Sequence, residues 1–283
     1  MEISAYLHER VQASVSQMVA LQAGVLADQE PEPLHQLRIQ LRRLAVLLQQ
    51  FEPALRLPDG VSSTRVAKIG RRLGLARDLD VLRDRLEHQL MPGLPEPELN
   101  ALKPMRKQLR RERRLAFSEV VEDLRGRRYL KLLARLQAWL RDPQFTPLAS
   151  EALEPWLPEF HSQLTGDLFL LPGWRSEVPD ELHNLRKRIK QCRYGLSLSP
   201  APALEPWLER LKRSKQLLGD LNDLALFQQA LEAGALAKAE QACPKLMEVL
   251  TSERQSVWQH WRVSSEQWLA SSTRRAFHQA LLG

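Results

Sequence analysis

The segment from Leu34 to Leu44 follows the period of an α-helix and has two different faces. Its leucines recur every three or four residues, which predicts one buried face. On a second face lie His35, Arg38 and Arg42, with no acid among them. At a rise of about 1.5 Å per residue, this cationic row is roughly 10 Å long. Solvated helix faces usually mix acids with bases, so a row without acids calls for an explanation, although one such row alone still favours an ordinary solvated face.

The same pattern returns far downstream, at His183, Arg186 and Lys190. A second landmark, Leu-Gly-x-x-(Arg/Asn)-Asp, begins at Leu73 and again at Leu218. The two landmarks keep their order, with offsets of 148 and 145 residues. This repetition predicts an internal duplication of a unit with about four helices. We therefore expect two four-helix-bundle-like halves, related by pseudo-twofold symmetry, over residues 1–145 and 146–283.

Good helix formers dominate nearly every segment, and no convincing alternating strand pattern is present. We therefore predict an all-α fold. Prolines and glycines punctuate the chain and separate the expected helices. The third of these is expected to bend near Gly70 and Gly74. The expected helical segments are 3–27, 34–51, 63–90, 98–123, 127–141, 149–170, 181–198, 205–232, 235–263 and 264–281.

The 283-residue chain is basic, with 41 Lys and Arg against 34 Asp and Glu and a net charge of +7. The excess lies in residues 1–141, which hold 25 cations and 17 acids, whereas residues 142–283 hold 16 and 17. This balance favours an anionic partner. The two cysteines, Cys192 and Cys243, have neither metal-site nor disulfide spacing. Without a signal-peptide core or a membrane-length apolar run, we expect a cytoplasmic protein with no membrane partner.

Further cations lie outside the two rows. Seven of the twelve residues in 103–114 are basic, a density that destabilises a helix unless a polyanion offsets the repulsion. Basic residues also precede the Leu-Gly landmark in each half, and we expect some of them to face the histidine rows. The candidate anion-binding residues are His35, Arg38, Arg42, Arg43, Lys68, Arg72, Arg106, Lys107, Arg110, Arg113, Arg114, His183, Arg186, Lys187, Lys190, Arg193, Lys212 and Lys215.

Three classes of function are compatible with these cations. The first is a non-enzymatic binder of an inorganic polyanion. The second is a nucleic-acid-binding protein, which the lack of aromatic residues among the basic rows disfavours. The third is an enzyme that transfers phosphoryl groups through His35 or His183, which the lack of an acid/base partner disfavours. Neighbouring Arg and Lys side chains would repel a divalent cation, so no metal and no cofactor is expected.

Together the landmarks resemble the CHAD domain family, the conserved histidine α-helical domains. The resemblance covers essentially the whole chain, 1–283, as a single domain. It implies two four-helix bundles that bind inorganic polyphosphate through basic residues of a central groove or pore, and it implies association with polyphosphate granules. We also expect a stand-alone member, without the triphosphatase-like domain of many relatives. The motifs concerned are His-x-x-Arg-x-x-x-Arg-Arg-Leu at 35–44, Leu-Gly-x-x-Arg-Asp-x-Asp-Val at 73–81, His-x-x-Arg-Lys-x-x-Lys at 183–190 and Leu-Gly-Asp-Leu-Asn-Asp at 218–223.

Overall fold

The structure is a computed structural model that describes residues 1–233 and 239–282, with side chains outside 229–240. Every regular element in these ranges is a helix, and the strand-like pairings found there are two isolated bridges. The predicted all-α fold is therefore confirmed. Among the described helices, none is both long and apolar enough to span a membrane.

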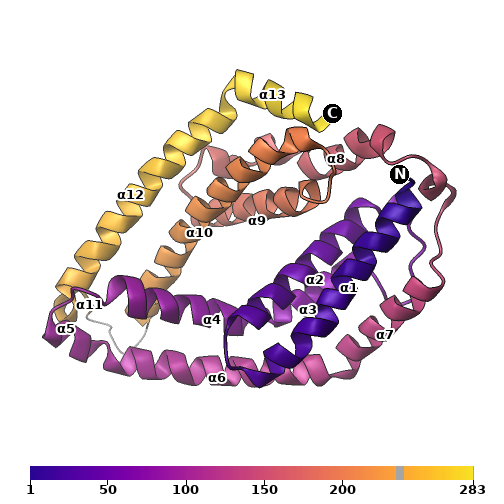
Figure 1. Cartoon of the computed structure of the whole chain (residues 1–283). Coiled ribbons are helices and arrows are strands. Elements are labelled where there is room, and N and C mark those ends of the chain that lie inside the picture. Colours follow the sequence, from indigo (N-terminus) through magenta and orange to yellow (C-terminus); the bar gives the residue numbers. More distant parts are fainter. Residues whose placement is uncertain (234–238, 283) are drawn as a thin grey trace.

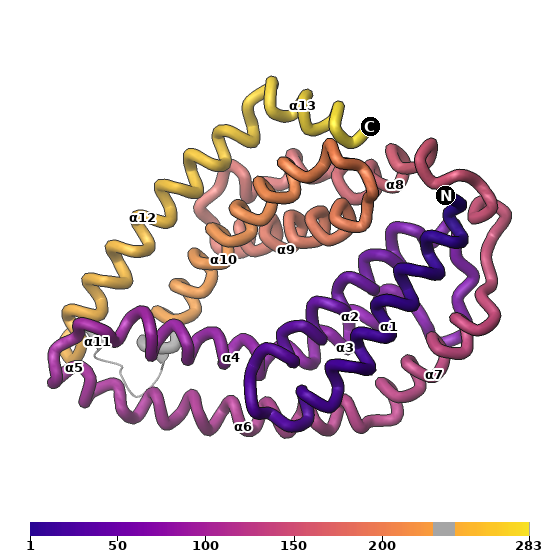
Figure 2. The backbone as a smooth tube through the Cα atoms, in the orientation of Figure 1, coloured from indigo at the N-terminus to yellow at the C-terminus, as the bar shows by residue number. Residues whose placement is uncertain are grey.

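In the first half, α1, α2 and α3 lie together, and α6 runs along one edge of the molecule (Figure 1, Figure 2). The expected third helix is divided in three, with a break at Leu73 and a π-helical turn over Leu86–Leu90. The helices are α1 (Ile3–Ala27), α2 (Glu32–Gln50), α3 (Ser63–Arg72), α4 (Gly74–Arg85), α5 (Glu96–Ala101), α6 (Lys103–Arg125) and α7 (Arg127–Arg141).

In the second half, α12 is the outer helix and α9 and α10 lie inside it (Figure 1). The expected helix over 149–170 is shorter, because a 3₁₀ turn that contains Pro155 precedes it and α8 begins only at Leu157, with Pro158 in its first turn. The start of the expected helix over 235–263 lies partly outside the described residues. The helices are α8 (Leu157–Thr165), α9 (Pro179–Leu196), α10 (Glu205–Ala233), α11 (Ala239–Ala242), α12 (Pro244–Leu269) and α13 (Ser271–Leu282).

The predicted boundary at residue 263 is wrong, because α12 continues to Leu269. Ser265 lies inside the helix and is buried, and its hydroxyl donates a hydrogen bond to the carbonyl of Trp174. A satisfied serine is tolerated within a helix. The chain leaves the helix only at Ala270, whose ψ of 134° is extended.

One buried apolar cluster crosses the predicted boundary between the halves. Most of its members belong to α1–α7, but Leu224 and Phe227 of α10 and Leu246 and Leu250 of α12 also belong to it. A second buried cluster, rich in tryptophan, lies within the second half. Burial of apolar surface is the main stabilising contribution to such a fold, so the first half depends on helices of the second half for part of its core.

A buried acid of the first half also holds the start of α12. Glu98 of α5 is 5% exposed. Its two carboxylate oxygens accept the backbone N–H groups of Lys245 and Leu246, both at 3.0 Å. The first N–H groups of a helix have no partner within the helix. Glu98 therefore supplies from a distant segment the cap that Cys243, at the N-cap position, does not provide.

Candidate anion-binding site

The helices that carry the two predicted rows, α2 and α9, are in direct contact. The side-chain amide of Gln191 donates to the side chain of Gln49 at 2.9 Å across this contact. The Tyr194 ring packs against two guanidinium groups, those of Arg42 and Arg193, whose Cζ atoms lie 5.7 and 5.2 Å from the ring centre. A cation over an aromatic face is an attractive arrangement, so this tyrosine joins arginines from both halves of the chain.

Around this contact lies a group of eight basic side chains, which we call the cationic cluster. All eight are half-buried, and each is close enough to another member to affect it electrostatically. They come from α2, α4, α9 and α10, so both halves of the chain contribute. The members are His35, Arg38, Arg42, Arg77, Arg186, Lys190, Arg193 and Lys215.

Among the described residues, one ion pair offsets the charge of the cationic cluster. Arg38 donates from Nη1 to Oδ1 of Asp78 at 3.2 Å. The cluster also contains buried guanidinium nitrogens, the Nε atoms of Arg38, Arg77, Arg186 and Arg193, for which the described chain offers no acceptor. Buried donors are normally paired in native proteins. The cluster is thus short of acceptors, and phosphate oxygens are acceptors that Arg binds well.

Burial and mutual repulsion alter the protonation of the cluster. Burial, followed by the charges of Arg42 and Arg186, lowers the pKa of Lys190 from 10.5 to about 7. Burial also lowers the pKa of His35, with a further contribution from Arg77, and lowers the pKa of Lys215. Desolvation and nearby like charges both disfavour a protonated base. The negative charge of an anion within the cluster would favour the protonated forms and so raise these pKa values.

A glycine positions one arginine of the cluster in each half. Arg38 donates to the carbonyl of Gly74 at 3.0 Å, and a Cβ at Gly74 would lie 3.4 Å from Nη2 of Arg38. The matching glycine, Gly219, would place a Cβ 3.6 Å from Nε of Arg186. The Leu-Gly landmarks therefore pack against the arginine three residues after each histidine. This recurrence fits the predicted repeat, while the duplication as a whole stays a prediction.

The basic segment 103–114 does not contribute to the cationic cluster, although five of its residues are among the candidate anion-binding residues predicted from the sequence. Arg106 and Arg110 both donate to Oε1 of Glu87, at 3.3 and 3.1 Å. Arg113 is only 9% exposed and pairs with Asp28 and Asp80. These carboxylates raise its pKa and hold it in a buried ion-pair network between α1, α4 and α6.

The remaining predicted residues are dispersed. Lys107, Arg114 and Lys187 are exposed, and Lys212 is exposed and pairs with Glu209 at 3.3 Å. Arg43 is half-buried on α2. Of the basic residues ahead of the Leu-Gly landmarks, Lys215 faces the cluster as expected, but Lys68 and Arg72 line a separate hollow between α3 and α7. Sequence reasoning did not include Arg77 among the candidate residues, although Arg77 belongs to the cationic cluster and lies inside the first Leu-Gly landmark.

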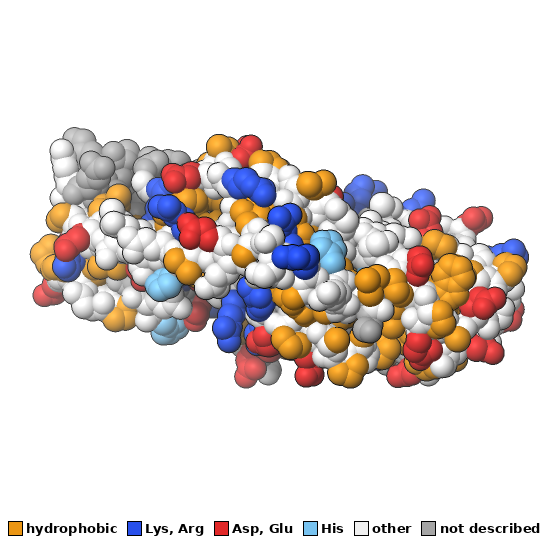
Figure 3. Space-filling view, turned by 90° about the horizontal axis from the view of Figure 1, so that it is seen from above, with side chains coloured by type: hydrophobic (Ala, Val, Ile, Leu, Met, Phe, Trp, Pro, Cys, Tyr) orange, Lys and Arg blue, Asp and Glu red, His pale blue; other side chains and the backbone are white. Residues whose placement is uncertain are grey.

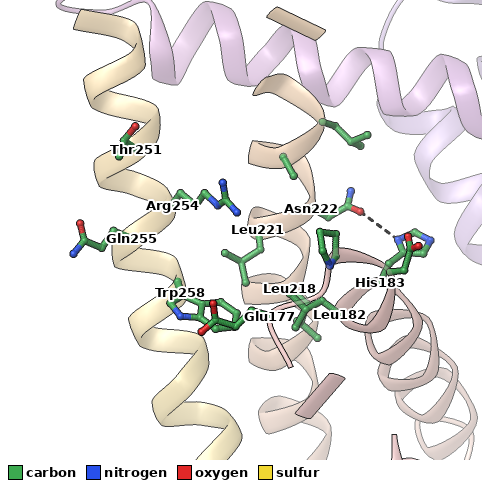
Figure 4. Close-up of a pocket in the computed structure, with 14 residues that line it drawn as sticks. Glu177, Leu182, His183, Leu218, Leu221, Asn222, Thr251, Arg254, Gln255 and Trp258 are labelled. Atoms are coloured by element: carbon green, nitrogen blue, oxygen red, sulfur yellow. Dashed lines mark hydrogen bonds between the residues drawn. The ribbon is translucent and has the colours of Figure 1, made fainter. Parts of the chain in front are cut away.

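His183 lines a cavity that contains no member of the cationic cluster. This cavity, of about 550 Å³, lies between α9, α10 and α12 (Figure 4). Nδ1 of His183 is 3.2 Å from Oδ1 of Asn222, and Arg254 extends from α12 toward α10. Much of the wall is apolar, including Leu218 and Trp258. The two histidines that head the predicted rows therefore have different surroundings.

Positive charge does not cover the surface uniformly. On the face drawn in Figure 3, Lys and Arg side chains gather near the middle, and acidic and apolar side chains surround them. No group of three His, Cys, Asp or Glu residues in the described part of the chain could hold a metal ion. The two cysteines are free and buried. The cationic cluster is therefore the candidate anion-binding site to which the two rows contribute.

The fold and these motifs define a CHAD domain protein. The family model for the CHAD domain matches residues 9–232, so the chain belongs to this family. The crystal structure of the CHAD domain from the plant Ricinus communis aligns with a TM-score of 0.67 at 21% identity, over 99% of this chain and 92% of that one. PptA from Streptomyces chartreusis aligns over 100% of both chains with a TM-score of 0.65 at 17% identity. These likenesses establish the fold.

Two curated relatives come from Mycobacterium tuberculosis. They are named "Uncharacterized protein MT2285" and "Uncharacterized protein Rv2226", and each is 24% identical over 238 residues. The matched region is 82% of this chain and 46% of each relative. The chain thus spans about half the length of these relatives.

Proposed function

We propose that this protein binds inorganic polyphosphate without chemical turnover and that the cationic cluster is its binding surface. One observation carries the proposal: half-buried basic side chains from both halves of the chain converge, with a single acid paired to them in the described structure. The CHAD family as a whole is associated with polyphosphate binding. A linear polymer of phosphates offers the repeated oxygens that such a group of Arg, Lys and His can bind.

The affinity should behave as that of a polyelectrolyte complex. Each phosphate that the cluster neutralises releases counterions, so the logarithm of the binding constant should fall linearly with the logarithm of salt concentration. Longer polymers should bind more tightly, because neighbouring phosphates reach the cluster at a high effective concentration. Absence of binding to long-chain polyphosphate at low salt would contradict the proposal.

Charge reversal tests the location of the site. The variant Arg38→Glu/Arg186→Glu changes one arginine in each half of the cluster, and we expect about a hundredfold loss of affinity and a flatter salt dependence. The control is Arg274→Glu/Arg275→Glu on α13, which also reverses two positive charges. Both of these arginines are exposed and lie outside the cluster. Equal losses in both variants would indicate a diffuse basic surface instead.

Because Arg38 also bonds to the backbone of Gly74, a milder variant is needed as well. Arg42→Gln/Lys215→Gln removes two positive charges of the cluster without introducing an acid. We expect it to weaken polyphosphate binding about tenfold while leaving the melting temperature close to that of the wild type. Circular dichroism melts of all variants separate lost binding from lost folding.

Two competing functions are tested with the same protein. RNA added at matched phosphate concentration should displace long-chain polyphosphate poorly; equal displacement would favour a nucleic-acid-binding protein. Incubation with polyphosphate should release no orthophosphate. If it does, and if His35→Gln abolishes the release, the protein is an enzyme.

Binding of the polymer would also determine where the protein resides. We propose that it associates with polyphosphate granules in the cytoplasm through the cationic cluster. A fluorescent fusion should collect on granules and become diffuse in cells that lack polyphosphate. The Arg38→Glu/Arg186→Glu variant should be diffuse in both kinds of cell.

A further inference from the structure

A second basic hollow lies between α3 and α7, and none of its residues belongs to the cationic cluster. Its volume is about 420 Å³. A single acid lines it, Asp123 at the end of α6, and Nε of Arg72 already binds that acid at 2.9 Å. The cations of the lining are Arg65, Lys68, Arg72, Arg128, Lys131 and Arg135.

The packing of α3 separates this hollow from the cationic cluster. Val66 of α3 is fully buried, and Gly70 packs against α2, where an added Cβ would lie 3.4 Å from Cβ of Leu41. Lys68 and Arg72 therefore point away from α2 and toward α7. A ligand in the hollow would meet a different set of cations from a ligand in the cluster.

Two guanidinium groups converge on one glycine at the edge of the hollow. Gly60 has a φ of +81°, and a Cβ on it would collide with Arg135 and lie 2.7 Å from Nη1 of Arg65. No described carboxylate forms an ion pair with either arginine. Both side chains are exposed, so water screens much of their mutual repulsion, and an anion between them could accept hydrogen bonds from both guanidinium groups.

Tyr129 provides a second, independent indication of a ligand. It lines the hollow, is 1% exposed, and its buried hydroxyl has no hydrogen-bond partner among the described residues. Burial raises the pKa of Tyr129 to about 12, so the hydroxyl keeps its proton and can donate. Leaving a buried donor unpaired costs stability, and buried Tyr hydroxyls usually have a partner.

We propose that the hollow is a second anion site, which takes a compact phosphate-bearing anion with a few phosphoryl groups. Arg65 and Arg135 would bind the phosphate oxygens at its edge, and Tyr129 would donate a hydrogen bond from its buried side. The volume lies in the range of small-ligand pockets. The hollow shares no residue with the cluster, so binding at this site is independent of polyphosphate binding by the cluster.

The test uses inorganic tripolyphosphate and the full-length Arg38→Glu/Arg186→Glu variant, in which the cluster is disabled and the hollow is intact. Isothermal titration should show about one equivalent bound. Adding Arg65→Glu/Arg135→Glu should lower the affinity about a hundredfold. The matched control, Arg71→Glu/Arg127→Glu, reverses one exposed charge on each of the same two helices outside the hollow. It should change the affinity by less than about threefold.

Tyr129→Phe removes only the hydroxyl and keeps the ring. We expect about a tenfold loss of tripolyphosphate affinity with an unchanged or higher melting temperature, because the unpaired buried hydroxyl is gone. Unchanged binding in both Tyr129→Phe and Arg65→Glu/Arg135→Glu would overturn the proposal. So would a loss confined to long-chain polyphosphate, which would assign the hollow to the polymer rather than to a compact anion.

Discussion

At the scale of single residues, Lys190 is the side chain that the cationic cluster changes most. Its pKa of about 7 results from burial and from Arg42, Arg186 and Arg38, while Asp78 acts in the opposite direction. In the free protein Lys190 is therefore largely neutral above pH 7 and charged below it. A bound polyanion favours the charged form, so binding takes up a proton wherever the free lysine is neutral.

This coupling predicts a pH dependence of affinity. Long-chain polyphosphate should bind about tenfold more tightly at pH 6 than at pH 8, because charging Lys190 costs one factor of ten per pH unit above its pKa. In Lys190→Arg the charge persists at both pH values, and the difference should shrink. The measurement is fluorescence anisotropy of labelled polymer at constant ionic strength.

Burial, followed by the charge of Arg77, lowers the pKa of His35 and favours its neutral form in the free protein, so a bound polyanion would favour protonation of His35 as well. The control is therefore the pair Lys190→Arg and Lys190→Arg/His35→Gln. In the double variant, most of the pH dependence of affinity that arises from the protein should be lost. An unchanged slope in the double variant would assign the effect to the terminal phosphates of the polymer.

Individual cations could be predicted from the sequence where they lie on the two histidine helices, because helical spacing alone places them on one face. Arg113 could not, because its partners Asp28 and Asp80 are brought to it by the folding of α1 and α4. A row of arginines in sequence looks the same whether an acid from a distant helix pairs with them or not. The roles of Arg77 and Tyr129 likewise depend on which helices become neighbours.

At the scale of elements, the breaks between helices follow proline and glycine where these residues are present, as before α8. The prediction of a helix end is wrong within α12, where the hydroxyl of Ser265 finds a hydrogen-bond acceptor in a distant segment and the helix continues to Leu269. The least predictable feature is the start of α12, which is stabilised by Glu98 of α5, a residue far away in the chain.

Replacing this cap should destabilise the fold measurably. Glu98→Gln keeps the shape of the side chain but replaces one accepting oxygen with an amide donor, which faces a backbone N–H. We expect a loss of about 1–2 kcal/mol in the free energy of unfolding, as for other lost helix caps. Urea denaturation followed by circular dichroism measures this loss.

The control for Glu98→Gln is Glu96→Gln, an exposed acid in the first turn of α5. It should change the free energy of unfolding by no more than about 0.5 kcal/mol. Equal effects of the two variants would mean that the charge of α5, and not the cap on α12, is what stabilises the fold.

At the scale of the whole molecule, the offset landmarks predict a helical protein with a repeated motif but not which apolar helix faces pack together across the two halves. The apolar cluster of the first half includes Leu224 and Phe227 of the second, which the sequence could not indicate because an apolar helix face does not identify its partner. The contact of α2 with α9 brings Arg38 and Arg42 of the first row together with Arg186 and Lys190 of the second.

That contact also makes the free protein sensitive to dissolved ions. Like charges of the cationic cluster repel one another across α2 and α9, and mobile ions screen such repulsion. Raising KCl from about 0.05 M to about 0.5 M should therefore increase the melting temperature of the free protein by a few degrees. In Arg42→Gln/Lys215→Gln the increase should be smaller; a decrease in the wild type would show that favourable ion pairs dominate.

Under the proposed function, salt should act oppositely on the two forms of the protein. Chloride ions that stabilise the empty fold should also displace the polymer, so the same electrolyte would strengthen the structure and weaken its complex. Small anions and polyphosphate would then be alternative counterions for one internal charge, and the polymer should prevail at low ionic strength because its phosphates are linked.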